Sequence, residues 1–214
     1  ARELGLEGAS DEAEYVLVAR DVMLNRKVGA KLDIQHISSK VTVDILRQAK
    51  REGICVYGEV TPQHLAATEE LVRDRGALAR VNPPLRTEED RRGLIEGLRD
   101  GTIDMIATDH APHAREEKEL PIAQAPSGMI GLETAFALVN TYAVRDGGVP
   151  LMTVLRAMTV NPARLYGLEA GQIAVGKPAD LVVLDPDETW EITDNFRSKA
   201  RNSPFIGWKV TGRV

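Results

Sequence analysis

This sequence of 214 residues has a single cysteine, no long apolar run and no excess of positive charge. The single cysteine, Cys55, can form no disulfide within the chain, and its apolar neighbours predict a buried, unreactive thiol. The net charge is −5 with acids and bases interspersed, so no basic face that would bind nucleic acid is expected. No apolar run approaches the ~18 residues of a membrane helix, so no membrane association is expected.

The start of the chain also lacks two features. No initiator methionine precedes Ala1, and no charged and then apolar leader follows it. We therefore expect a cytoplasmic protein, and we expect that this sequence starts part-way along a longer chain. The hydrophobic share of 43% is sufficient for a substantial core.

Apolar periodicity and turn residues predict an α/β fold. Helices are expected at 11–28, 40–51 and 87–101, and strands within 31–38, 53–61, 79–85 and 102–109. Strands that alternate with helices indicate a parallel sheet covered by helices. After a helical stretch at 150–168, glycine and proline turns surround β-branched runs. We therefore predict two parts, residues 1–170 and a β-rich segment at 171–214.

Each predicted strand places an unusual polar residue at its carboxyl end, namely His36, His64, Asn82 and Asp109. Functional side chains in (β/α)8 barrels come from the ends of several strands and converge on one face. Two imidazoles and a carboxylate form a ligand set that suits catalytic zinc, and an aspartate beside the metal can carry a proton to a leaving nitrogen. Taken singly, each histidine could be structural, and the aspartate could be a helix cap.

Several motifs resemble those of the bacterial dihydroorotases of the amidohydrolase superfamily. They include "DIQHISSK", "EVTPQHL", "VNPPLR" and "IATDHAPH", followed by "PSGMIGLETAFAL", "NPARLYGL", "GQIAVGKPADLVVLD" and "SPFIGWKVTGRV". The resemblance implies a (β/α)8 barrel with a small β-sandwich. It also implies zinc, two ions per complete site, and the reversible cyclisation of N-carbamoyl-L-aspartate to dihydroorotate in pyrimidine biosynthesis.

The same resemblance implies roles for individual residues. His36 and His64 match ligands of one metal, and Asp109 matches a ligand of the other metal that also acts as general base and acid. Four further residues match positions that contact the substrate: Asn82, His113, Ser127 and Gly128. His110 is expected either to support the metal site or to pack in the interior.

The family's histidine-x-histidine pair, the arginine that follows it and a bridging carboxylate are absent. Since a (β/α)8 barrel needs about 250 residues, the resemblance covers a C-terminal half, and we expect the isolated chain to be inactive. A homo-oligomer is expected, with association with aspartate transcarbamoylase as a further possibility. The alternatives are a different cyclic amidohydrolase (allantoinase or dihydropyrimidinase), a non-catalytic subunit that scaffolds aspartate transcarbamoylase, and a plain α/β domain.

Overall fold

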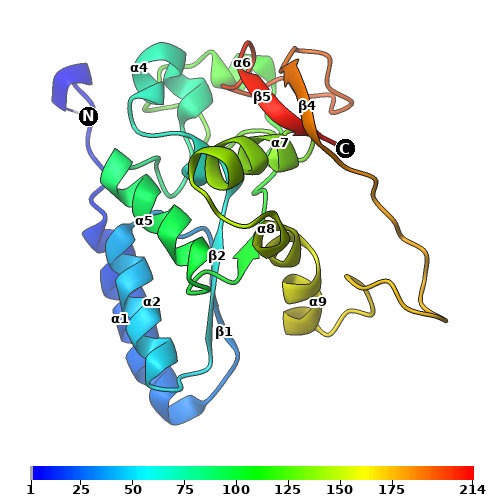
Figure 1. Cartoon of the computed structure of the whole chain (residues 1–214). Coiled ribbons are helices and arrows are strands. Elements are labelled where there is room, and N and C mark those ends of the chain that lie inside the picture. The colour runs from blue at the N-terminus through cyan, green and yellow to red at the C-terminus, as the bar shows by residue number, and fades with distance from the viewer. Residues whose placement is uncertain (1) are drawn as a thin grey trace.

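A parallel sheet of three strands forms the centre of the molecule, which we describe over residues 2–214 from a computed structural model (Figure 1). The strands are β1 (Leu32–Ile34), β2 (Val56–Val60) and β3 (Met105–Ile106), in the order β1-β2-β3. Ile34 lies opposite Gly58, and Val60 lies opposite Ile106. The expected α/β sheet is therefore confirmed, although within residues 2–214 its three strands do not close into a barrel.

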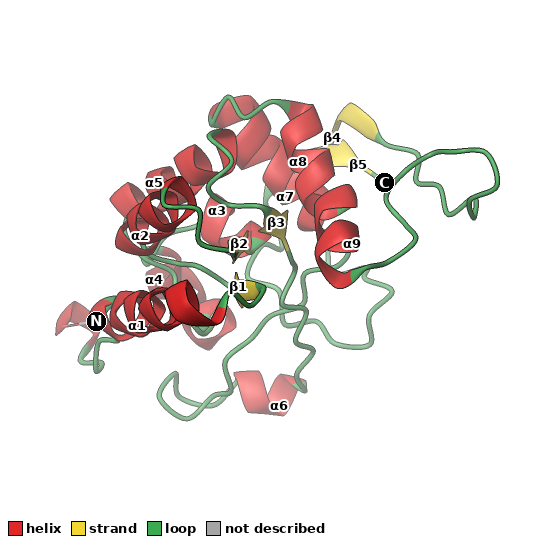
Figure 2. Cartoon of the chain, turned by 90° about the horizontal axis from the view of Figure 1, so that it is seen from below, coloured by secondary structure: helices red, strands yellow, loops and turns green. Residues whose placement is uncertain are grey.

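Three long helices flank the strands as the sequence predicts: α1 (Glu12–Val28), α2 (Lys40–Arg51) and α5 (Glu88–Arg99). Local capping sets the starts of α2 and α5, because the Ser39 side chain accepts a hydrogen bond from Val41 N and Thr87 forms a capping box with Asp90. The predicted helical stretch near the end of the barrel part forms α8 (Leu151–Met158) and α9 (Val160–Tyr166). Figure 2 shows these helices in an arc around the strands.

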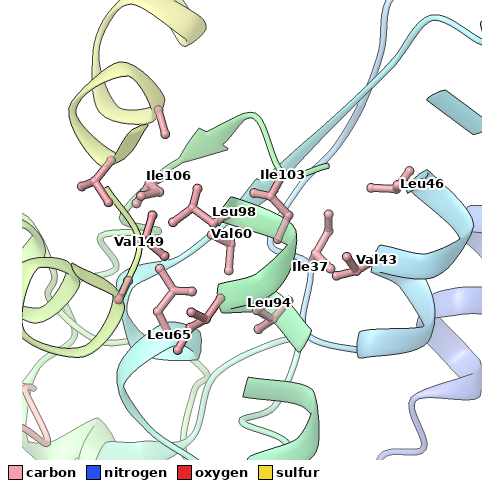
Figure 3. Packing of buried hydrophobic residues seen from close by; sticks show 14 of the residues in the cluster. Ile37, Val43, Leu46, Val60, Leu65, Leu94, Leu98, Ile103, Ile106 and Val149 are labelled. Carbon is pink, nitrogen blue, oxygen red and sulfur yellow. The ribbon is translucent and has the colours of Figure 1, made fainter. Parts of the chain in front are cut away.

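The core lies between the sheet and this arc of helices (Figure 3). Leu46 of α2 and Leu98 of α5 are fully buried, and they share one hydrophobic cluster with Val60 of β2 and Ile106 of β3. Burying a side chain of this size contributes roughly 1.5–3 kcal/mol. Val60 and Ile106 are the last residues of their strands, so this packing against the helices fixes the carboxyl ends of β2 and β3.

The predicted strand at 79–85 is wrong. A 3₁₀ turn covers Gly76–Ala79, and the residues that follow are neither helix nor strand. Pro83 and Pro84 have no N–H to donate to a ladder. The segment is held in other ways, since Arg80 O accepts a hydrogen bond from Gly128 N at 2.9 Å.

Short helices and turns connect the main elements. They are a 3₁₀ turn (Arg2–Leu4), α3 (Pro62–Ala66), α4 (Leu71–Arg75), α6 (Arg115–Lys118), and α7 (Ala135–Val139), which continues as a π-helix (Asn140–Asp146). Among residues 2–214, no helix combines the length and the apolar character needed to cross a membrane.

The C-terminal segment contains an antiparallel pair of strands, β4 (Asp185–Glu191) and β5 (Lys209–Arg213). Val210 of β5 and Phe205 pack with Leu138 of α7 in a second hydrophobic cluster. The residues at 171–184 form neither helix nor strand and extend away from the body in Figure 1. The division of the chain at residue 170 stays a prediction.

Candidate functional site

His36 and Asp109 meet beyond the carboxyl ends of two strands. His36 lies two residues after β1 and Asp109 three residues after β3, and His36 Nε2 is 3.6 Å from Asp109 Oδ1. Both residues have a left-handed backbone, with φ of 53° for His36 and 48° for Asp109. Residues other than glycine rarely adopt this conformation, and it is concentrated at functional sites. Both side chains remain partly exposed, at 25% and 32%.

Glu59 of β2 also lies beside His36, and it was not among the site residues predicted from the sequence. Its Oε1 is 2.8 Å from His36 Nδ1, in an orientation that gives neither atom a well-aligned hydrogen bond. The Glu59 carboxylate raises the pKa of His36, against the opposing effect of burial. Glutamate is almost never buried without a partner, so a glutamate inside the strand VYGEV was the available signal.

His64 does not join the pair. It lies within α3 rather than at a strand end, and it is buried. The Thr61 hydroxyl lies 2.6 Å from Nδ1 and donates to it, because Nε2–H donates to Pro83 O at 3.0 Å. Burial lowers the pKa of His64 to about 4, so the ring is neutral at neutral pH. With both ring nitrogens engaged, His64 offers no lone pair to a metal, and we leave it out of the ligand set.

The bond from His64 instead positions the loop that carries Asn82. This loop contains a cis peptide bond between Asn82 and Pro83, and the Asn82 side chain is exposed. Gln63, next to His64, is buried and donates to Thr108 O at 3.4 Å, just before Asp109. Helix α3 therefore links the Asn82 loop to the end of β3.

The remaining predicted substrate residues lie together. His113 Nε2 donates to Ser127 O at 3.0 Å. Gly128 has φ of +127°, and a Cβ placed there would lie 2.6 Å from the Cβ of Ala111. Only glycine combines that backbone conformation with such a close approach. The loop at 126–128 is thus packed tightly against the segment that follows Asp109.

His110 is bonded to the backbone of residues 129–132. Its Nδ1 accepts hydrogen bonds from Gly131 N at 3.1 Å and Leu132 N at 3.5 Å. His110 also forms an isolated parallel bridge with Met129. These contacts hold the chain that follows the 126–128 loop beside the end of β3.

Comparison with known proteins places this arrangement in a family. The sequence model of the Amidohydrolase family matches residues 5–214. The chain belongs to the amidohydrolase family. This amidohydrolase is 52% identical over all its residues to the dihydroorotase of Clostridioides difficile (strain 630) and 49% identical to that of Lactococcus lactis subsp. lactis (strain IL1403). The resemblance to dihydroorotases is thereby confirmed, but the chain spans about half (51%) of each relative.

Solved structures agree on the fold. The L-hydantoinase (dihydropyrimidinase) from Arthrobacter aurescens superposes with a TM-score of 0.86 at 34% identity, over 92% of this chain and 45% of that one. The dihydropyrimidinase from Brevibacillus agri NCHU1002 gives 0.87 at 27% identity, over 96% and 47%. Each match again covers about half of the longer chain.

The side chains of His36 and Asp109 suit a divalent metal both in their chemistry and in the distance between them. The resemblance assigns these two residues to different ions, but the spacing also suits one shared ion: tetrahedral zinc with bonds of 2.0–2.1 Å separates neighbouring ligand atoms by about 3.4 Å, close to the observed 3.6 Å. A catalytic zinc ion takes three protein ligands, however. Within residues 2–214 no group of three or more histidine, cysteine, aspartate or glutamate side chains is arranged to hold a metal. This part of the chain can therefore contribute only some of the ligands of such a site.

Proposed function

We propose that this chain is the C-terminal half of a dihydroorotase, which interconverts N-carbamoyl-L-aspartate and dihydroorotate with the aid of zinc, two ions per complete site. The observation that carries the proposal is the approach of His36 Nε2 to Asp109 Oδ1. The identity of 52% to a dihydroorotase over all 214 residues supports the choice of substrate.

His36 and Asp109 would hold metal, and the other ligands would come from outside this chain. When bound, zinc lowers the pKa of a coordinated water toward about 7 and so supplies a nucleophile at neutral pH. In the hydrolytic direction Asp109 would accept a proton from the attacking water and deliver it to the leaving ring nitrogen. In the cyclising direction the same carboxylate would run these transfers in reverse.

The substrate would lie between the Asn82 loop and the 126–128 loop. The Asn82 amide could pair with a ring amide of the substrate, and His113 could donate to a carboxylate through Nδ1 when both of its ring nitrogens carry protons. Ser127 and Gly128 would form the wall beside His113, because Ser127 O accepts the His113 Nε2–H.

Barrel closure would come from the part of the protein outside this chain. Strand β1 lies at an edge of the sheet, and an exposed edge is normally covered. Exposed apolar side chains on α1, Met23 at 68% and Val28 at 71%, lack a covering surface. The same holds for Ile173 and Val183, exposed by 91% and 86% in the extended segment. A preceding part of similar length would cover these surfaces, in keeping with a chain that spans 51% of the relatives it matches.

A second candidate is a hydantoinase or dihydropyrimidinase, because the solved structures that match are of such enzymes. The identities favour dihydroorotase, at 52% against 34%. A scaffold for aspartate transcarbamoylase is the alternative without catalysis. Homo-oligomer formation and the cytoplasmic location remain predictions.

The deciding experiment uses the full-length protein with zinc. We expect hydrolysis of dihydroorotate and little hydrolysis of hydantoin or dihydrouracil. The isolated chain, which supplies too few ligands, should show no turnover. Full-length protein that binds zinc yet leaves dihydroorotate intact would refute the proposal. Preference for hydantoin or dihydrouracil would establish the second candidate instead.

A further inference from the structure

Asn202, in the C-terminal segment, connects the segment that follows Asp109 to the 126–128 loop of the candidate substrate site. The residue is 3% exposed. Its Oδ1 accepts from His113 N at 3.2 Å, and its Nδ2 donates to Ala111 O at 2.9 Å and to Gly128 O at 3.3 Å. One side chain thus bonds both the segment after Asp109 and the 126–128 loop.

Lys118, the last residue of α6, reaches the same loop. Its side chain is buried, with 6% of the residue exposed, and its Nζ donates to Pro126 O at 2.9 Å and to Gly128 O at 3.0 Å. No carboxylate within residues 2–214 forms a salt bridge with it. Burial lowers the pKa of Lys118 to about 8. Burying a charged ammonium group is unfavourable unless it is hydrogen-bonded. The bonds from Lys118 to the loop carbonyls therefore indicate a role in holding the loop.

The two donors converge on a single acceptor, the carbonyl oxygen of Gly128. On the other side of the same residue, Gly128 N donates a hydrogen bond to Arg80 O. The backbone of Gly128 is therefore hydrogen-bonded through both its N–H and its C=O. Its φ of +127° is a conformation that residues with a Cβ rarely adopt. The neighbouring Ser127 O then meets His113 Nε2.

We propose that Lys118 and Asn202 are positioning residues that fix the 126–128 loop against His113 and so preform the substrate subsite. They would not touch the substrate themselves. The inference rests on the proposed function, since it assigns these two residues to the substrate subsite of that enzyme.

The test compares full-length zinc-loaded variants. Lys118→Met removes both donated bonds, and Asn202→Asp keeps the acceptor for His113 N but loses both donors. Arg115→Met is the matched control on α6, with a side chain 87% exposed, and Asn195→Asp is the exposed control in the C-terminal segment. We expect the KM for dihydroorotate to rise about tenfold in the first two variants, with kcat within twofold and zinc content unchanged.

Amide hydrogen exchange provides a readout that needs no activity. Exchange at residues 127–130 should become faster in the two test variants and stay unchanged in the controls. If Lys118→Met fails to fold, Lys118→Gln keeps one donor and takes its place. Lower thermal stability with unchanged KM and unchanged loop exchange would overturn the inference, because it indicates a purely structural role.

The two proposals fail in different ways. Wild-type protein that does not hydrolyse dihydroorotate refutes the function but not the positioning of the loop, which faster exchange would still support. Wild-type turnover combined with unchanged KM and unchanged exchange in both variants overturns the positioning and leaves the function standing.

Discussion

The Glu59 carboxylate lies 2.8 Å from Nδ1 of His36, on the side of the ring opposite the nitrogen that faces Asp109. A histidine that binds metal commonly has its other ring nitrogen held by a carboxylate, which fixes the ring orientation and raises its basicity. Glu59 is in the position to do this for His36. Glu59 belongs to the central strand β2, which is fixed in the packed core. The core therefore sets the position of the carboxylate that orients the His36 imidazole.

Replacing Glu59 by glutamine should weaken zinc binding. The neutral amide keeps the size of the side chain but loses the charge that supports His36. We expect the zinc affinity of the full-length protein to fall about 10–100-fold, measured by competition with a chromophoric chelator. Glu89→Gln, at a site 77% exposed, is the control and should bind zinc normally. Equal affinities in the two variants would contradict a role for Glu59 at the metal.

Asp109→Asn should remove activity and retain the fold. Asparagine tolerates the left-handed backbone at this position, with φ of 48°, so the chain pays no new strain. Loss of the proton acceptor should lower kcat by about 10²–10⁴-fold. Asp187→Asn, where the side chain is 85% exposed, is the matched control. Near-normal kcat in Asp109→Asn, measured by dihydroorotate hydrolysis, would rule out the proton-transfer role.

Gly128→Ala should disturb the substrate loop more than an ordinary glycine replacement. The new Cβ would lie 2.6 Å from Ala111 Cβ and 3.0 Å from His113 Nε2. Gly29, with φ of +67° and no atom within 4 Å of a built Cβ, is the control for backbone strain alone. We expect Gly29→Ala to cost about 1–2 kcal/mol of stability without changing KM. Gly128→Ala should raise the KM for dihydroorotate, and an unchanged KM would argue against a substrate loop here.

The neutral, buried His64 makes stability depend on pH. Its pKa is about 4 in the folded chain, below the ordinary value of 6.5 that we assume for the unfolded chain. Between these values the unfolded state binds more protons, so stability rises with pH across that window and is lost as pH falls from about 6.5 to 4. The shift corresponds to roughly 3 kcal/mol.

His64→Gln should therefore flatten the pH dependence. Urea midpoints of wild type and variant, measured at several values between pH 4 and 7.5, give the comparison. The difference between the two proteins should be largest near neutral pH and should shrink toward pH 4. If the midpoints of the two proteins changed with pH in parallel, protonation of His64 would not be coupled to unfolding, and the prediction would be wrong.

Much of the fold follows from local sequence. The starts of α2 and α5 were predictable, because Ser39 and Thr87 are capping residues directly before apolar periodic runs. The strand at 79–85 was not, because apolar content suggests a strand while Pro83 and Pro84 prevent ladder pairing. A short apolar run does not reveal whether a partner strand is available.

The sequence by itself determined the family, through motifs at fixed intervals, and it determined that His36 and Asp109 belong near one edge of the sheet, since parallel strands end together. Only the tertiary structure decided which way each side chain points. It turned His64 toward Thr61 and Pro83, and it brought Glu59, Lys118 and Asn202 to the site. The physical reason is that capping and periodicity act over a few residues, whereas burial and hydrogen bonding of polar groups depend on segments far apart in the chain.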